Sequence, residues 1–247
     1  MGAPSARRDA DAIEAELRAH GTRKRAAGEK RYLKSDLEFV GASLPQVQAA
    51  AKRYLADHQA LSRERLLELV EALWSKPIHE RRATAVALLE RRRELVGPRD
   101  LRLLERLVRE SRTWALVDPI AVHVLGGILT RYPRSAPRLN RWARDDDFWV
   151  RRASLLAWIE PLREGAPFGA FGGYADAMLD EREFFILKAI GWVLRDMGRR
   201  RPEEVVEWLG PRTGRASGVT MREAVKYVDP ADRERLMAAY REKRPAA

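Results

Sequence analysis

A unit of about 35 residues recurs along this chain, and this period constrains the fold more than any other feature. Residues 148–153 (Phe-Trp-Val-Arg-Arg-Ala) match residues 184–189 (Phe-Phe-Ile-Leu-Lys-Ala) at a separation of 36. Residues 81–84 match residues 151–154 at a separation of 70, which is twice the unit. A unit of this length holds two helices and buries its apolar face only by stacking on its neighbours. Chance recurrence of Arg-Ala pairs is the alternative, and the matching aromatic and aliphatic residues argue against it.

Helix signals recur along the chain, whereas strand signals are weak. Residues 66–74 carry apolar side chains at helical spacing, with Ser62 as the N-cap and Pro77 ending the run. The sequence has no sustained apolar–polar alternation and no Asn-Gly or Asp-Gly hairpin turn. We therefore predict an all-α fold, a curved solenoid of HEAT-like helical-hairpin repeats with a basic concave face. Further helices are predicted after Pro45 and Pro98 and over residues 114–130, 136–144, 148–159, 174–179, 184–198, 203–209, 222–228 and 230–243.

The predicted domain organisation is simple. Residues 29–247 are expected to form a single HEAT-like-repeat domain, preceded over residues 1–28 by an N-terminal arm or helix that frays. Four glycines match neither a dinucleotide-binding pattern nor a P-loop, and we expect a loop there. They are Gly165, Gly169, Gly172 and Gly173.

The charge balance points to a polyanionic partner. Lys and Arg number 47 against 36 Asp and Glu, a net charge of +11, and nucleic acid is the usual partner of such a chain. Only 8 of the 47 are Lys, however, and a bias toward Arg can arise from genome composition alone. The absence of Cys excludes disulfides, thiol catalysis and Cys-ligated metals. No metal or organic cofactor is expected, and a cytoplasmic location, in the bacterial cytosol or nucleoid, fits the lack of a leader or apolar span.

One acidic residue interrupts a row of basic residues at the repeat spacing. Arg82, Arg152 and Lys188 occupy equivalent places in their units, and the missing place between the first two falls on Asp118. Basic groups along a concave surface suit a phosphate backbone, whereas a carboxylate among them opposes anion binding. Asp118 therefore either pairs with Arg152 or meets a cationic centre in the ligand.

Two of the seven tryptophans differ from the rest by their neighbours. Trp114 precedes Asp118 by four residues, so the two share a helix face. Trp192 lies on one face with Lys188 and Arg195. Most tryptophans pack in cores, but an aromatic ring among cations also suits contact with a sugar or base.

At these residues the sequence resembles the AlkD-type DNA alkylation repair enzymes, which are HEAT-like-repeat DNA glycosylases. The resemblance covers roughly residues 30–240 without large insertions. Its most specific segment is residues 188–195, Lys-Ala-Ile-Gly-Trp-Val-Leu-Arg. It is also carried by residues 32–35, 39–41, 71–74, 113–118, 148–153 and 222–226.

The resemblance implies a role for individual residues of this chain. Asp118 corresponds to the catalytic carboxylate, Trp114 and Trp192 to the sugar-contacting tryptophans, Arg152 to their basic partner, and Tyr32 to the aromatic residue near the lesion. Lys34, Arg82, Arg151, Lys188, Arg195 and Arg222 are the further residues predicted to contact DNA. The chain departs from the family at Thr113 and Ala115, where a second Trp and an acid are common, which bears on rate or lesion range.

The activity implied is that of a monofunctional alkylpurine DNA N-glycosylase in base excision repair. Its partner would be double-stranded DNA containing alkylated bases, bound by a monomer. The N3- or N7-alkylated purine is cationic and leaves without protonation, which agrees with the lack of a poised His or second acid. The alternatives are a non-catalytic HEAT-repeat protein that binds distorted or branched DNA or RNA, and a protein–protein scaffold. Asp118, Trp114 and Trp192 together favour the enzyme, since binding alone needs no acid in the groove.

Overall fold

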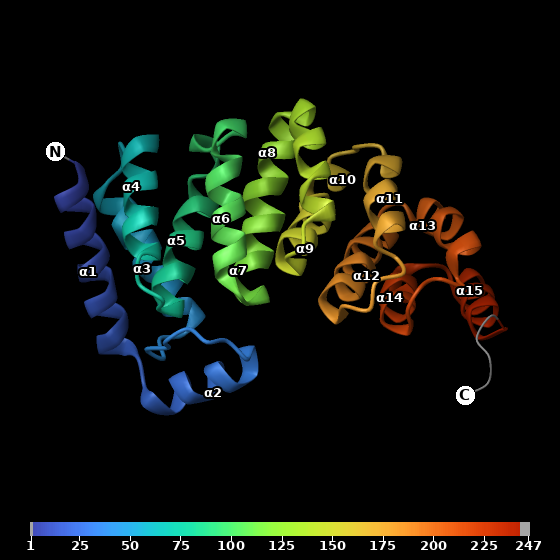
Figure 1. The fold of residues 1–247 in the computed structure, drawn as a ribbon, viewed down its shortest axis with the longest axis horizontal. Coiled ribbons are helices and arrows are strands. Elements are labelled where there is room, and N and C mark those ends of the chain that lie inside the picture. The colour runs from blue at the N-terminus through green and yellow to red at the C-terminus, as the bar shows by residue number, and fades with distance from the viewer. Residues whose placement is uncertain (1, 243–247) are drawn as a thin grey trace. The chain divides into compact units, whose positions relative to one another are not determined.

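The computed structural model describes residues 2–242, and nearly all of them are helical or lie in short connections (Figure 1). Within residues 2–242 there is no β-sheet, and one isolated bridge joins Glu38 and Ile78. The all-α helical-repeat fold predicted from the sequence is confirmed. The chain divides into two compact units, Met1–Val124 and Leu125–Ala247.

The first unit is a stack of paired helices. In it α4 packs between α1 and α5, α3 packs on α5, and α7 packs against α5 and α6. The buried face of each helix contributes to one core, in which Leu66, Leu69 and Leu73 of α4 are fully buried. The helices are α1 (Gly2–His20), α2 (Arg23–Leu33), α3 (Leu44–Asp57), α4 (Arg63–Trp74), α5 (His79–Arg91), α6 (Leu101–Ser111) and α7 (Trp114–Pro119).

Local signals begin these helices where the sequence predicted. The Ser62 hydroxyl accepts a hydrogen bond from the Arg65 amide at 3.2 Å and caps α4. Pro45 lies in the first turn of α3, where its missing N–H costs nothing. Short 3-10 turns at Arg93–Leu95 and Pro98–Asp100 lead into α6.

The N-terminal segment is helical and packs on the first unit. Ala10, Ile13 and Leu17 of α1 are buried. Arg81 of α5, only 2% exposed, donates hydrogen bonds to Asp11 at 3.0 Å and to Glu14 at 2.5 Å. Burial opposes ionisation of Glu14, but hydrogen bonds from Lys76, Arg18 and Arg81 outweigh it and lower its pKa to about 2. The segment therefore contributes both apolar surface and ion pairs to the first unit, whereas the predicted boundary after residue 28 stays a prediction.

The predicted helix over residues 114–130 contains a change of winding. α7 ends at Pro119, Ile120–Leu125 form a π-helical turn, and α8 (Gly126–Arg131) continues the chain. Proline has no N–H to donate and its ring crowds the preceding turn, so it disturbs the regular ladder of a helix. The π-turn begins directly after Pro119, and Asp118 immediately precedes that proline.

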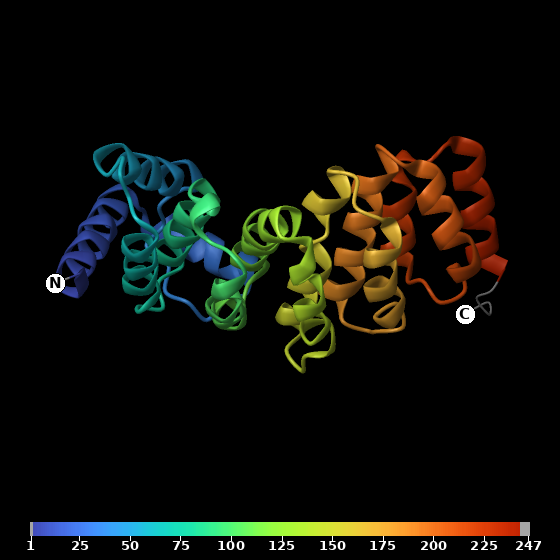
Figure 2. The same ribbon diagram turned by 90° about the horizontal axis from the view of Figure 1, so that it is seen from above.

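The second unit is built around α12. This helix packs against α9, α10, α13 and α14, and its closest packing is with α14. Figure 2 shows the orange and red helices of this unit lying side by side. The remaining bounds are α9 (Phe148–Leu156), α10 (Ile159–Arg163), α11 (Phe168–Ala177), α12 (Phe184–Gly198), α13 (Pro202–Leu209), α14 (Gly218–Ala224) and α15 (Pro230–Glu242).

Two local predictions in the second unit are wrong. The expected glycine loop is largely α11, because Phe168, Phe171 and Ala175 bury one face of it and outweigh the low helix propensity of glycine. The α-helix expected over residues 136–144 is instead two 3-10 segments, Pro133–Asn140 and Trp142–Arg144. Two prolines in the first of these segments prevent regular α-helical hydrogen bonds.

Ion pairs at the repeat spacing join neighbouring repeats within each unit. In the first unit Arg106 pairs with Glu71, 35 residues earlier. In the second, Arg215 pairs with Asp180 and Lys188 with Glu223, each across 35 residues. These pairs show that some of the basic residues serve contacts between repeats.

Candidate functional site

The sequence around Asp118 presents an acid and an aromatic ring on one short helix. Thr113 is buried, has an extended backbone, and caps α7 by accepting a hydrogen bond from the Ala115 amide at 3.4 Å. Trp114 opens the helix and is partly exposed, and Asp118 follows one turn later with 8% of its surface exposed. Because residues four apart share a helix face, the indole and the carboxylate lie on the same side of α7.

Tyr32 lies beside Trp114 although 82 residues separate them. The Tyr32 ring is 73% exposed and meets the indole edge-on, with ring centroids 6.0 Å apart and planes at 86°. This is a favourable geometry for two aromatic rings. Two of the predicted site residues are therefore brought together with Asp118 in the first unit.

A clamped loop supports this position of Tyr32. After α2, Lys34 adopts a left-handed conformation, and the buried Glu80 carboxylate accepts the Val40 amide at 3.1 Å and the Gly41 amide at 2.6 Å. Burial raises the pKa of Glu80. His79, the first residue of α5, stacks on the Phe39 ring of this loop. Burial lowers the pKa of His79 to about 4. The loop is therefore fixed to the start of α5.

A basic cavity of about 490 Å³ lies in the same unit. Arg82 forms part of it, is 9% exposed, lies over the Trp74 ring at 5.0 Å, and donates to the Glu110 carbonyl at 2.6 Å. Burial lowers the pKa of Arg82. This guanidinium is therefore fixed by the protein, and its predicted contact with DNA stays a prediction. The cavity lining comprises Asp36, Leu37, Pro77, Arg82, Arg109, Glu110 and Arg112.

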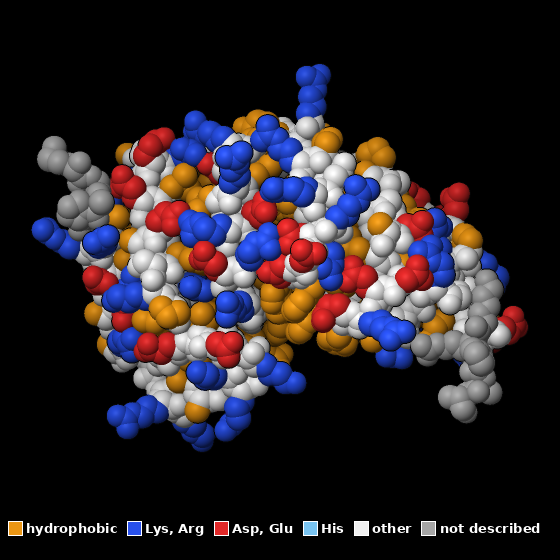
Figure 3. Space-filling model, in the orientation of Figure 1, with side chains coloured by type: hydrophobic (Ala, Val, Ile, Leu, Met, Phe, Trp, Pro, Cys, Tyr) orange, Lys and Arg blue, Asp and Glu red, His pale blue; other side chains and the backbone are white. Residues whose placement is uncertain are grey.

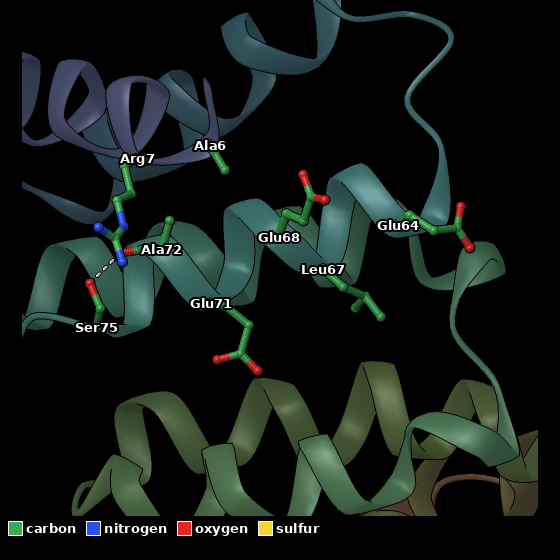
Figure 4. A pocket seen from close by; sticks show the side chains of 8 residues that line it. All are labelled: Ala6, Arg7, Glu64, Leu67, Glu68, Glu71, Ala72 and Ser75. Atoms are coloured by element: carbon green, nitrogen blue, oxygen red, sulfur yellow. Dashed lines mark hydrogen bonds between the residues drawn. The ribbon is translucent and has the colours of Figure 1, made fainter. Parts of the chain in front are cut away.

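A second cavity of the first unit has the opposite character. It has a volume of about 550 Å³ and lies between α1 and α4 (Figure 4). Three glutamates of α4, Glu64, Glu68 and Glu71, line it, together with Arg7, Leu67 and small residues. Carboxylates repel phosphate, so this cavity is a poor candidate for a nucleic-acid contact.

In the second unit the arginines of α9 are held by protein groups. Arg152 is 3% exposed, donates to the Phe185 carbonyl, and lies 5.7 Å from the centre of the Phe185 ring. Arg151 donates a bidentate pair of hydrogen bonds to the two Glu181 carboxylate oxygens, each at 3.0 Å. It also donates to the Asp145 carbonyl. Arg151 thus has a structural role that the sequence did not suggest.

The cations of α12 are organised by an acid that sequence reasoning missed. Lys188 and Arg195 both pair with Glu223 of α14, whereas Trp192 lies between them and is partly exposed. Of the other predicted contacts, Lys34 and Arg222 are exposed. The signal for Glu223 was its place in the repeat, 35 residues after Lys188.

The predicted catalytic set is divided between the two units, with Asp118 and Trp114 in the first and Arg152 and Trp192 in the second. On the face drawn in Figure 3, red acidic and blue basic side chains are interspersed over the helices of each unit. Within residues 2–242 no group of His, Asp or Glu side chains is arranged to hold a metal ion. None of the helices described is both long and apolar enough to cross a membrane.

Comparison with known proteins identifies the family. A family model described as DNA alkylation repair enzyme matches residues 13–228. The chain belongs to the DNA alkylation repair enzyme family. A solved structure titled as a predicted DNA alkylation repair enzyme from Enterococcus faecalis has a similar fold, with a TM-score of 0.77 and 24% sequence identity. The match covers 85% of this chain and 98% of that chain, whereas no curated protein matches.

Membership of this family agrees with the resemblance seen in the sequence and supports a role in the repair of alkylated DNA. Two functional candidates were missed from the sequence alone, namely Arg109 and Arg112 of the basic cavity. Neither occupies the repeat position shared by Arg82, Arg152 and Lys188, so no periodic signal marked them.

Proposed function

We propose that the protein is a monofunctional DNA glycosylase that hydrolyses the N-glycosidic bond of N3- and N7-alkylated purines, such as 3-methyladenine and 7-methylguanine, in duplex DNA. The observation that carries the proposal is the placement of the buried Asp118 one helical turn from Trp114, with the exposed Tyr32 ring against that indole. A site that only bound phosphates would gain nothing from a carboxylate there.

The chemistry follows from the charge of the lesion. Alkylation at N3 or N7 makes the purine cationic, so it departs as a neutral base with the electron pair of the C1′–N bond. Positive character then develops on the deoxyribose. Asp118 stabilises that charge and orients the water that attacks C1′, and no acid is required for the leaving group.

Each unit contributes an aromatic side chain to the proposed contact with DNA. In keeping with the family resemblance, Trp114 in the first unit and Trp192 in the second are each proposed to present an electron-rich ring face to deoxyribose, a contact that strengthens as positive charge develops. Tyr32 contacts the lesion region, and Arg152, which is 3% exposed and donates to the Phe185 carbonyl, contributes positive charge rather than an exposed phosphate contact. The protein acts as a monomer and initiates base excision repair.

Part of the nonspecific duplex affinity comes from cations of the first unit. The basic cavity offers the exposed Arg109 and Arg112 beside the loop that leads to Trp114, and the buried Arg82 adds positive charge. The planar guanidinium group of arginine can donate two parallel hydrogen bonds to phosphate oxygens, so this lining suits the DNA backbone.

The test is release of free bases from methylated duplex DNA. We expect the wild-type protein to release 3-methyladenine and 7-methylguanine, to leave the strand uncut until the abasic site is cleaved separately, and to release no uracil or hypoxanthine from matched duplexes. Chromatography of the released bases measures each product. Binding without release, at protein concentrations that saturate the DNA, would instead identify a non-catalytic DNA-binding protein.

A further inference from the structure

Three cations of the second unit surround one buried carboxylate. Glu223 of α14 accepts a hydrogen bond from Lys188 Nζ at 2.7 Å and another from Arg195, both on α12. Lys226 Nζ, one turn along the chain, lies 3.6 Å from the same carboxyl group. Burial opposes ionisation of Glu223, but the three cations outweigh it and lower its pKa. The carboxylate is therefore charged at neutral pH.

The cluster keeps a positive excess that faces solvent. Three cations and one carboxylate leave a net charge of +2 on the cluster. The side chain of Glu223 is 10% exposed, whereas those of Lys188, Arg195 and Lys226 are 39%, 27% and 51% exposed. Among residues 2–242, Lys188 and Arg195 donate to no other acceptor. Their remaining N–H groups are thus available to an anion outside the protein.

Close packing of α12 on α14 makes the cluster rigid. A Cβ at Gly191 would lie 2.8 Å from Glu223 Cβ and 3.2 Å from the Thr220 backbone, so only glycine permits this approach. The Thr220 hydroxyl also donates to the Leu187 carbonyl at 3.0 Å. Cations held in this way lose little side-chain entropy when an anion binds.

We propose that Glu223 is a positioning residue that holds Lys188, Arg195 and Lys226 as a binding site for one DNA phosphate. The inference rests on the proposed function, since it assigns this phosphate to the strand whose sugar contacts Trp192, on the same face of α12. A lysine and an arginine free in solvent would attract phosphate equally by charge, but they would not be preorganised for it.

The same helix carries a matched control. Taken as whole residues, Asp196 and Glu223 are both 8% exposed. Asp196 of α12 also holds two cations: it accepts two hydrogen bonds from Arg163, at 2.9 Å and 2.6 Å, and lies 3.7 Å from Arg200. Among the described residues Asp196 has no third cation at a comparable distance, and because it directly follows Arg195, its side chain points about 100° around α12 from that of Arg195.

The experiment compares Glu223→Gln with Asp196→Asn in binding to an unmodified duplex, by fluorescence anisotropy over a range of salt concentrations. Both variants gain one positive charge, so net charge alone predicts tighter binding by both. We expect Glu223→Gln to bind about 3–10-fold more weakly, with a log–log salt slope shallower by about one, and Asp196→Asn to bind as tightly as the wild type or more so. Equal or tighter binding by Glu223→Gln would overturn the proposal.

Thermal melting establishes whether each variant is folded. If Glu223→Gln does not fold, Lys188→Gln and Lys226→Gln decide, because these side chains are exposed and each should weaken binding and reduce the salt slope. An unchanged slope in both would overturn the site. Base release from methylated DNA is measured separately: binding that depends on Glu223 without any release would reject the glycosylase and keep the phosphate site.

Discussion

Two buried glutamates, one in each unit, perform opposite tasks. Glu80 in the first unit accepts two backbone amides and fixes the loop behind Tyr32, and burial raises its pKa. Glu223 in the second unit accepts cations, which lower its pKa. The first unit thus uses a carboxylate to place an aromatic ring beside an acid, and the second uses one to place cations. This difference suggests that bond cleavage depends mainly on the first unit and duplex affinity on the second.

The largest expected effect falls on the acid of the first unit. Asp118→Asn removes the charge that stabilises the developing cation while preserving size. We expect single-turnover base release to slow by about 10²–10³-fold, with duplex affinity equal or higher. A rate within a few-fold of the wild type would show that Asp118 is not the catalytic carboxylate.

The next effect concerns packing in the second unit. Gly191→Ala places a methyl group 2.8 Å from Glu223 Cβ, and we expect a loss of about 1–3 kcal/mol in the free energy of unfolding. The control is Gly173→Ala, at an exposed position of α11 with no atom within 4 Å of the new Cβ. That variant should gain about 0.5–1 kcal/mol from helix propensity. Urea denaturation measures both free energies of unfolding, and equal changes for Gly191→Ala and Gly173→Ala would contradict the close approach of α12 and α14.

The pH dependence of stability tests the clamped loop of the first unit. The pKa of His79 is about 4 in the folded chain and 6.5 when unfolded, so the unfolded chain takes up the proton first. Stability therefore falls as pH drops from 6.5 toward 4, by about 2 kcal/mol between pH 7.5 and pH 5. His79→Phe keeps an aromatic ring against Phe39 and should lose less. Protonation of Glu80, whose pKa is raised, acts in the opposite direction in both proteins.

The smallest expected effect concerns Arg112, which combines a strained backbone conformation with a place in the basic cavity. Arg112 has a φ of 48°, in the left-handed region that favours glycine. Arg112→Gly should therefore unfold at the same or a higher temperature, while binding duplex DNA a few-fold more weakly because a cavity cation is lost. Unchanged affinity would remove Arg112 from the DNA contact.

The parts of the fold that depend on residues close together in the sequence, or on the repeat period, were predictable from the sequence. The Ser62 cap, the proline at the start of α3 and the 35-residue period all act locally or recur, and each leaves a visible pattern. The α11 glycines were misleading because the burial of Phe168 and Phe171 against other helices outweighs propensity. The change of winding directly after Pro119 was also missed, although that proline is a local signal for it.

The candidate site was predictable in its residue types but not in its partners. The interruption of a basic row indicated Asp118, and helical spacing paired it with Trp114. The Tyr32 ring contact and the Glu223 cluster join residues far apart in the chain, so only tertiary structure shows them. Arg151 and Arg82 were expected to contact DNA, yet each is held by protein oxygens.

The most direct test of this division is single-turnover release of 7-methylguanine, measured over a range of protein concentrations for wild type, Asp118→Asn and Glu223→Gln. We predict that Asp118→Asn lowers the plateau rate and leaves the half-saturating concentration equal or lower. Glu223→Gln should raise the half-saturating concentration and leave the plateau rate near that of the wild type. A lowered plateau for Glu223→Gln, or an unchanged plateau for Asp118→Asn, would contradict the account.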